Sequence, residues 1–347
     1  MSAQERRIRV AVLGAGSWGT TVAIHLFKLN HRVALWEYFP ENVAYMNKTR
    51  RNPLLTGIPI PREIIISNDL VETVRDAEAI IVAVPSHTMR DLMINVQGKI
   101  NDDIIIINLS KGIEEKTLLR MSEVIHTVLH HPRDKIVTLS GPSHAEEVSR
   151  EVPTAVVAAS TDINSSRLVQ QLFNSNYLRV YTSNDIVGVE IGGAIKNIIA
   201  IASGICDGLG LGDNSKAALI TRGLMEIIRM GVYLGAKEST FAGLSGVGDL
   251  IVTCGSKHSR NRYVGEEVGK GRKLSEILDG MSMVAEGVHT CNTVHQMIDR
   301  YNILMPICTE IYNILFRDKD PRSALVDLMT REPVDEWHSV PDKNETN

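Results

Sequence analysis

A glycine-rich stretch near the N-terminus constrains the fold more than any other feature of the sequence. The apolar run at residues 8–14 leads directly into "GAGSWGT", which places Gly14, Gly16 and Gly19 in the G-x-G-x-x-G spacing. That spacing alone is a weak signal, but here it follows a strand-like run and opens a helix-like segment from Trp18 to about Leu29. The sequence therefore predicts a loop that holds a pyrophosphate at a helix N-terminus, with a plain glycine-rich turn as the alternative.

Apolar runs of strand type continue through the first half of the chain. They are rich in Ile and Val and occupy residues 32–37, 63–68, 79–84, 103–110, 135–141, 154–160 and 178–185. Longer mixed segments separate them. Such runs suit strands that are buried on both faces, as in a mostly parallel sheet with helices around it. We predict an α/β Rossmann-type N-terminal domain.

The strand signal stops near residue 185. Later segments, such as residues 215–236 and 305–316, carry apolar residues at helical spacing. We therefore predict an all-α C-terminal domain. The expected division is 1–185 for the dinucleotide-binding domain, 186–335 for the helical domain that carries substrate and catalysis, and 336–347 for a loose tail.

Composition excludes several classes of protein. The formal net charge is −4, so a basic surface for nucleic acid is not expected. Four cysteines without a C-x-x-C pair predict neither a disulfide framework nor a metal site, and they suit the reducing cytoplasm. The N-terminal apolar run is too short for a signal peptide, and no later run is expected to reach the length of a membrane span.

The residue that ends the second strand-like run bears on the choice of coenzyme. Glu37 lies about 20 positions past the glycine loop, where an acidic side chain accepts the ribose 2′-hydroxyl of NAD and repels the 2′-phosphate of NADP. A solvated strand end is the alternative for Glu37. The coenzyme is therefore NAD or NADP, with a lean towards NAD.

The helix-like stretch "EIGGAIKNIIA", residues 190–200, contains an unexpected lysine. On a helical wheel the isoleucines form one stripe, whereas Lys196 lies on a face of glycine, alanine and serine. Small residues leave room beside Lys196 for a ligand or another backbone. The alternative is a lysine that reaches solvent over that face. Asn197 is expected to make a structural hydrogen bond.

Other polar residues complete a candidate site. Asp249 follows a glycine-rich turn and is a potential partner for a buried Lys196. Arg260 offers a rigid donor fork that suits phosphate. Lys111 follows a predicted strand, at the edge of the sheet where open α/β proteins bind ligands. Each is a common surface feature alone, but together they indicate a site.

With these residues in view, the chain resembles bacterial NAD(P)-dependent glycerol-3-phosphate dehydrogenase. The shared stretches include "GAGSWGT", "SKGIEE", "GPSHAEEV", "VEIGGAIKNIIAIASGICDGLGLGDNSKAALITRGL", "GVGDLIVTC", "HSRNR" and "VAEGV". The resemblance implies reversible reduction of dihydroxyacetone phosphate to sn-glycerol 3-phosphate, a precursor of phospholipids. It also implies a homodimer. The "GSKH" loop, residues 255–258, departs from the acidic or amide-rich stretch expected there.

The resemblance also assigns roles to individual positions. The catalytic residues would be Lys196 as general acid and base, Asp249 as its orienting partner, and Lys111. The cofactor would be contacted by Gly14, Gly16, Ser17, Trp18, Gly19, Tyr38, Lys111, Ala145, Arg260, Val284 and Glu286. The substrate would be contacted by Lys111, Gly141, Ser143, Lys196, Asp249, Ser259, Arg260 and Asn261.

Two other functions fit parts of the same pattern. A β-hydroxyacid dehydrogenase, acting on substrates such as 6-phosphogluconate, also pairs a Rossmann domain with a lysine-bearing helix. A dinucleotide sensor would bind NAD without chemistry, but it would need an output module such as a basic DNA-reading helix, and the sequence offers none.

Overall fold

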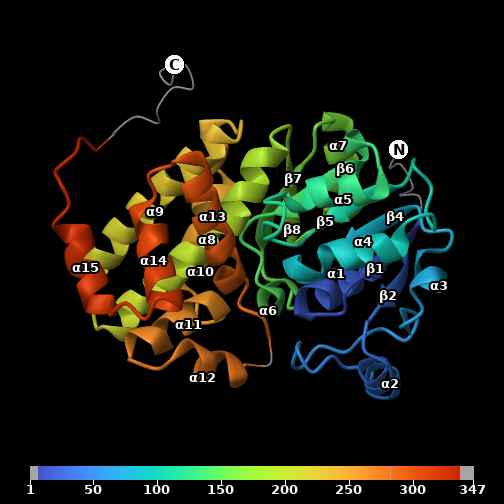
Figure 1. Cartoon of the computed structure of the whole chain (residues 1–347). Helices are drawn as coiled ribbons and strands as arrows, with labels where there is room; N and C mark the ends of the chain where they lie inside the picture. Colours follow the sequence, from blue (N-terminus) through green and yellow to red (C-terminus); the bar gives the residue numbers. More distant parts are fainter. Residues whose placement is uncertain (1–6, 282, 337–347) are drawn as a thin grey trace. The chain divides into compact units, whose positions relative to one another are not determined.

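One sheet of eight strands organises the first half of the chain. The computed structural model describes residues 7–281 and 283–336 (Figure 1). The strands are β1 (Arg9–Leu13), β2 (Arg32–Trp36), β3 (Ile65–Ser67), β4 (Ala79–Val82), β5 (Ile105–Asn108), β6 (Ile136–Ser140), β7 (Thr154–Ala159) and β8 (Leu178–Ser183). Every neighbouring pair is parallel except β6 and β7. The predicted, mostly parallel sheet is confirmed.

The strand order creates a switch point beside the glycine loop. The sheet runs β3-β2-β1-β4-β5-β6-β7-β8, so the chain proceeds outward in opposite directions from β1 and from β4. Because such crossovers are right-handed, the helices after β1 and after β4 cover opposite faces of the sheet. Open α/β sheets bind ligands outside the carboxyl ends of the strands at this point. The loop after β1 therefore lies where a dinucleotide site is expected.

Helices connect the strands of this first unit. They are α1 (Ser17–Lys28), α2 (Pro40–Thr49), α3 (Leu70–Val74), α4 (Met89–Val96), α5 (Met121–Leu129), α6 (Ala145–Val148) and α7 (Ile163–Phe173). The central strands are apolar on both faces, and Val10, Val12, Ile81, Ile107 and Val137 have no exposed surface. This two-sided burial explains why the strands read as continuous apolar runs.

The second half is helical in the described residues, as predicted. Its helices are α8 (Ile186–Gly208), α9 (Asp213–Tyr233), α10 (Asp249–Gly255), α11 (Arg260–Gly269), α12 (Leu274–Asp279), α13 (Glu286–Tyr301), α14 (Pro306–Phe316) and α15 (Pro321–Met329). The expected tail at 336–347 lies outside the described residues except for Glu336.

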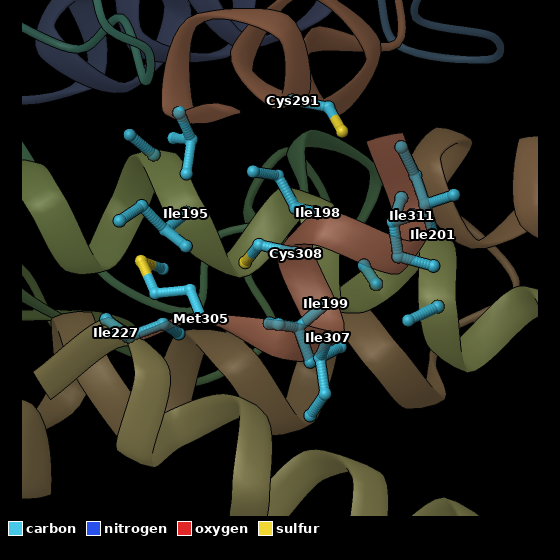
Figure 2. Close-up of a cluster of buried hydrophobic side chains, with 14 of the residues drawn as sticks. Ile195, Ile198, Ile199, Ile201, Ile227, Cys291, Met305, Ile307, Cys308 and Ile311 are labelled. Carbon is cyan, nitrogen blue, oxygen red and sulfur yellow. The ribbon is translucent and has the colours of Figure 1, made fainter. Parts of the chain in front are cut away.

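Helix α8 forms the core of the second unit. Figure 2 shows Ile195, Ile198 and Ile199 of α8 near Ile307 and Cys308 of α14. By length and composition α8 is able to cross a membrane, so the expectation that no apolar run reaches that length was wrong. However, 94% of its most apolar window is buried inside the protein. The burial accounts for its apolar composition.

Glycines bring α8 and α11 into backbone contact. A Cβ atom on Gly265 would lie 1.9 Å from the carbonyl oxygen of Ile201, and one on Gly204 would lie 1.9 Å from that of Arg262. Neither position has space for a side chain. The small residues of α8 therefore set the distance to the helix that begins with Arg260.

The boundary between the two compact units is crossed more than once. The first unit comprises the chain up to Ser110 together with Met121–Ile186, and the second comprises Lys111–Arg120 together with the chain from Val187 onward. We call Lys111–Arg120 the crossing segment. The sequence interpretation, which divides the chain once near residue 185, gives no sign of it.

Candidate functional site

The glycine loop of the first unit has the geometry of a phosphate-binding turn. Gly14 has a φ of +108°, and a Cβ there would lie 2.7 Å from the carbonyl oxygen of Ala83, the residue after β4. A Cβ on Gly19 would lie 1.9 Å from the carbonyl oxygen of Gly14, so the start of α1 packs tightly on the turn. Around Gly16, in contrast, no atom beyond the adjoining residues lies within 4 Å of such a Cβ. The open space is at the glycine expected to face a pyrophosphate.

The N-terminus of α1 is suited to an anion. Gly16 is the N-cap, no side chain caps the helix, and its first turn carries no acidic residue. Ser17 and Trp18 form the first turn. Ala145 lies nearby, because its carbonyl oxygen accepts a hydrogen bond from Thr21 of α1 at 3.4 Å. These residues of the first unit fit the diphosphate of a dinucleotide.

The end of β2 presents a carboxylate and an aromatic surface. Glu37 Oε1 accepts hydrogen bonds from the backbone N–H of Phe39 at 3.1 Å and from the side chain of Asn42 at 3.4 Å. Tyr38 is 68% exposed and lies edge-to-face with Phe39, at 5.1 Å between ring centroids. One oxygen of Glu37 is thus fixed by its own loop, and aromatic rings beside it offer a stacking surface.

Gly141 and Ser143 follow β6. Gly141 has a φ of +134°, and a Cβ there would lie 3.1 Å from the Cα of Val156. The hydroxyl of Ser143 donates to the carbonyl oxygen of Gly141 at 3.0 Å. This turn belongs to the first unit, as do the glycine loop and Tyr38.

Two lysines share one buried carboxylate in the second unit. Lys196 Nζ on α8 lies 2.5 Å from Asp249 Oδ1 at the start of α10, and Lys111 Nζ on the crossing segment lies 2.7 Å from Asp249 Oδ2. The side chain of Asp249 is 2% exposed, that of Lys196 6%, and that of Lys111 21%. The interpretation of Lys196 as a lysine that reaches solvent is therefore wrong.

Burial and charge act against one another in this cluster. Burial lowers the pKa of Lys196 to about 8, although the charge of Asp249 acts in the opposite direction, and the charge of Lys111 lowers it further. Burial also acts to raise the pKa of Asp249, but the two lysines outweigh it and hold that pKa below its ordinary value. An ionised Asp249 with two ammonium groups leaves one net positive charge in a buried site.

Thr253 completes the cluster and was missed by the sequence analysis. Its hydroxyl donates to the backbone carbonyl of Asp249 at 2.6 Å and accepts from Lys196 Nζ at 2.6 Å. Asp249 and Thr253 are four residues apart on α10 and therefore share a helix face. That spacing was the signal available in the sequence. Thr253 fixes the direction of the ammonium group.

The glycine face of α8 packs against backbone near Lys196. A Cβ on Gly192 would lie 2.7 Å from the carbonyl oxygen of Ser245, in the turn before α10. Ser203 donates to the carbonyl oxygen of Cys254 at 3.1 Å. The small residues of α8 were expected to leave room for a ligand or for another backbone. At Gly192 the space is taken by another backbone, that of Ser245.

The start of α11 presents Arg260 and Asn261. Ser259 is the N-cap, and its hydroxyl accepts from the backbone N–H of Arg262 at 3.2 Å, so its oxygen has a structural partner. Arg260 is exposed and forms no ion pair with any residue that the structure describes. Asn261 is buried, and its Oδ1 accepts from the N–H of Gly287 at 2.9 Å. A free guanidinium at a helix N-terminus suits a phosphate.

The loop that leads into α13 lies beside the start of α11, and both belong to the second unit. Val284 and Glu286 are partly buried, and Glu286 begins α13. A Cβ on Gly287 would lie 2.7 Å from the carbonyl oxygen of Asn197 and 2.9 Å from Asn261 Oδ1. The side chain of Asn197 itself is buried. Asn261 and Gly287 therefore lie beside Asn197, the residue that follows Lys196.

The predicted site residues thus form two groups. The glycine loop, Tyr38, Gly141, Ser143 and Ala145 belong to the first unit, whereas Lys111, Lys196, Asp249, Ser259, Arg260, Asn261, Val284 and Glu286 belong to the second. Direct contacts join Lys111, Lys196 and Asp249. Lys111 comes three residues after the end of β5 at Asn108, and it belongs to the second unit together with Asp249.

A dinucleotide fold joined to a helical unit with a buried lysine–aspartate cluster defines the class of NAD(P)-dependent dehydrogenases. Comparison with known proteins narrows this class. Residues 9–166 match the description "NAD-dependent glycerol-3-phosphate dehydrogenase N-terminus", and residues 185–326 match "NAD-dependent glycerol-3-phosphate dehydrogenase C-terminus". The chain belongs to the NAD(P)-dependent glycerol-3-phosphate dehydrogenase family.

Individual relatives match over almost the whole chain. "Glycerol-3-phosphate dehydrogenase [NAD(P)+]" of Thermoanaerobacter sp. (strain X514) is 48% identical over 96% of this chain and 100% of its own length. The protein of the same name from Chlorobium phaeobacteroides (strain BS1) is 48% identical over 95% and 99%. The crystal structure of glycerol-3-phosphate dehydrogenase from Coxiella burnetii superposes with a TM-score of 0.90 at 36% identity, over 94% of this chain and 99% of that one.

Proposed function

We propose that this protein reduces dihydroxyacetone phosphate to sn-glycerol 3-phosphate with NADH or NADPH, and catalyses the reverse reaction, as a source of phospholipid precursor. The cluster of Lys196, Asp249 and Lys111 carries the proposal, because it offers a buried proton donor with an excess of positive charge. The names of the relatives support the same substrate pair. They do not favour a β-hydroxyacid dehydrogenase or a non-catalytic sensor.

The protein's part in the reaction is to hold the ketone and to manage one proton. When bound, NAD(P)H supplies the hydride. Negative charge then develops on the carbonyl oxygen, and Lys196 donates a proton to it. Asp249 and Thr253 orient the ammonium group, while Lys111 adds positive charge that favours the oxyanion. In the reverse direction neutral Lys196 accepts the proton of the alcohol.

Substrate phosphate is assigned to the start of α11. Arg260 has an uncommitted guanidinium there, and Asn261 is held by Gly287 with its amide nitrogen still available. Gly141, Ser143 and Ser259 remain proposed substrate contacts. Val284 and Glu286 remain proposed contacts of the nicotinamide, and Ser17, Trp18, Tyr38 and Ala145 of the rest of the coenzyme.

Assays with dihydroxyacetone phosphate test the function directly. We expect initial rates that saturate with this substrate, and Lys196→Met should lower kcat by about 10²–10⁴-fold, the usual contribution of a positioned acid. The affinity for NADH, measured by fluorescence titration, should stay the same. Lys270→Met, which removes an exposed lysine of the second unit, serves as the control. A Lys196→Met variant that retains its kcat would exclude the assignment.

The preference between coenzymes rests on Glu37. A carboxylate fixed at the end of β2 accepts a ribose hydroxyl and repels a 2′-phosphate, so we propose that NAD is preferred. Glu37→Ala should lower the ratio of kcat/KM for NADH to that for NADPH by at least about tenfold, since removing a charge repulsion of ~1.4 kcal/mol has that effect. Glu41→Ala removes another carboxylate from the first turn of α2 and should leave the ratio unchanged. An unaltered ratio in Glu37→Ala would contradict the proposal.

Location and assembly belong to the same proposal. All four cysteines are free and buried, which suits the reducing cytoplasm. We also propose a homodimer, in line with the resemblance to other dehydrogenases of this type. Sedimentation velocity of the full chain measures the assembly state.

A further inference from the structure

The buried ion pair between Arg120 and Glu190 lies outside the catalytic cluster, yet it holds the segment that carries Lys111. We propose that Arg120 and Glu190 are positioning residues: they fix the crossing segment so that Lys111 engages Asp249, and through Asp249 they set the position of Lys196. This inference rests on the proposed function, because Lys111 and Asp249 matter only if Lys196 is the proton donor.

The crossing segment is a closed hairpin, so its two ends move together. Ile113 and Arg120 form an antiparallel bridge. Between them, the N–H of Glu114 donates to the carbonyl oxygen of Leu119 at 2.9 Å, and the N–H of Leu118 donates to that of Glu114 at 2.8 Å. Lys111 is two residues before the bridge. A displacement of Arg120 is therefore transmitted to the backbone beside Lys111.

Both ends of this hairpin are attached to the helices that carry the cluster. At one end Lys111 bonds to Asp249 of α10. At the other end Arg120 Nη1 lies 2.5 Å from Glu190 Oε2, and Glu190 belongs to α8, about 9 Å before Lys196 along the helix axis. The hairpin, α8 and α10 thus form one frame around Lys196.

Like the bond from Lys111 to Asp249, the Arg120–Glu190 pair is a buried and directional attachment of the segment. Its side chains are 11% and 3% exposed. Ile113 is buried among apolar side chains, which impose no direction, and the bond of Asn292 to Glu115 at 2.6 Å is exposed. A buried ion pair is seldom the most stable solution, since apolar replacements are often equally stable. A guanidinium does fix geometry, because its donors are rigid and planar.

Loss of this anchor should alter the charges that Lys196 meets. In the described part of the chain, the charged or ionisable groups that shift the pKa of Lys196 are Asp249, Lys111 and Cys254. Of these, only Lys111 is carried by the hairpin. If Arg120 no longer holds the hairpin, Lys111 moves away from Asp249, and its repulsion of the Lys196 ammonium weakens. A purely structural role for Arg120 would not move the pH dependence.

A double-mutant cycle tests the proposal on the full chain. We expect Arg120→Met to lower kcat for dihydroxyacetone phosphate by about 10–100-fold, the scale of a misplacement near 1 Å. Its pH profile should move to higher pH, as that of Lys111→Met does. The variant Lys111→Met with Arg120→Met should match Lys111→Met alone within about twofold, because the two residues act through one contact.

Two further variants separate positioning from stability. Arg120→Lys keeps a donor and should recover part of kcat. Arg120→Met combined with Glu190→Met replaces the pair by apolar side chains; it should fold and still show the loss of kcat and the shifted profile. Glu310→Gln breaks another partly buried ion pair of the second unit, with Lys319, and should leave the pH profile unchanged.

Several outcomes would overturn the inference. Full turnover in the apolar double variant would reduce the pair to a stability role. Arg120 does not act through Lys111 if the losses of kcat in Arg120→Met and Lys111→Met multiply in the double variant. The same conclusion follows if Arg120→Met leaves both kcat and the pH profile unchanged. The unsubstituted chain tests the proposed function separately: if it fails to turn over dihydroxyacetone phosphate, that function fails, whereas normal turnover with multiplying effects rejects the inference alone.

Discussion

At the residue scale, the central feature is an aspartate that neutralises one of two lysines. Asp249 is buried and bonds Lys111 with one oxygen and Lys196 with the other. A single buried ammonium would lose its proton readily, and Asp249 opposes this loss. The charge of Lys111 lowers the pKa of Lys196 again, so it partly offsets the effect of Asp249. The cluster thereby holds the pKa of Lys196 at about 8, which suits the proposed role of Lys196 as both proton donor and proton acceptor.

This balance predicts opposite pH dependences for the two directions. In the proposed mechanism ketone reduction needs protonated Lys196, whose pKa burial lowers to about 8, so the kcat of reduction should fall as the pH rises through about 8. Alcohol oxidation needs neutral Lys196, so its kcat should rise over the same range. Profiles of kcat between about pH 6 and 10, in both directions, measure this.

The charges beside Lys196 predict in which direction the pH profile moves in two matched variants. Lys111→Met removes a positive charge that lowers the pKa of Lys196, so the profile should move to higher pH. Asp249→Asn removes the negative charge that raises it, so the profile should move to lower pH. Profiles that move in the same direction in both variants would contradict the electrostatic explanation.

Part of this cluster could be predicted from the sequence. The wheel separated Lys196 from the isoleucine stripe, and a buried lysine needs an acidic partner, which pointed to Asp249. The wheel did not predict that α8 is buried on all sides, because it contrasts the faces of one helix and contains nothing about neighbouring helices. Thr253 was missed because a lone threonine on an apolar helix carries no charge signal.

At the element scale, glycines fix the distance between α8 and α11. A Cβ on Gly265 would lie 1.9 Å from the carbonyl oxygen of Ile201, so Gly265→Ala must push the helices apart. We expect Gly265→Ala to lower the free energy of unfolding by about 1–3 kcal/mol, the usual cost of overpacking. Urea unfolding followed by circular dichroism measures the loss.

Another helical glycine of the same unit gives the control. Gly255 ends α10, and no atom outside the adjoining residues and the backbone of its own helix lies within 4 Å of a Cβ placed there. Gly255→Ala should leave stability unchanged or raise it slightly, because alanine favours helix. Equal losses in Gly265→Ala and Gly255→Ala would show that helix propensity, rather than interhelical contact, dominates.

The strands were predictable where the helix contacts were not. Each of the eight predicted runs contains one observed strand, because two-sided burial leaves a continuous apolar signature that local sequence reveals. The contact of Gly265 with Ile201 depends on residues distant in sequence, and a glycine in a helical pattern gives no sign of its partner.

At the scale of the whole molecule, the chain passes between the two units after Ser110, after Arg120 and after Ile186. The crossing segment contributes Ile113 to the second core and Lys111 and Arg120 to buried ion pairs. Pulling it out would leave Asp249 and Glu190 without these partners, at a cost of roughly 3–5 kcal/mol for each broken pair. Because the crossing segment is joined to the first unit at both ends, we expect the stability of the second unit to depend on the folded state of the first.

We accordingly expect the two units to unfold together. Trp18 and Trp36 report on the first unit, so tryptophan fluorescence can be followed in a Trp337→Phe background and compared with far-ultraviolet circular dichroism. The urea midpoints of the two signals should coincide. Gly265→Ala, although it lies in the second unit, should lower both midpoints equally. A fluorescence midpoint that stays in place would contradict this coupling.

The crossing segment also decides how this protein can be taken apart. A fragment that begins at Val187 contains every helix from α9 to α15 but lacks Lys111 and Arg120. Exchange of the helical half between two relatives at that point would join a cluster from one parent to a lysine from the other. A recombinant that keeps the site of one parent must carry Lys111–Arg120 along with that parent's helices. A division of the chain at residue 187 therefore separates Lys111 and Arg120 from the helices whose buried carboxylates they contact.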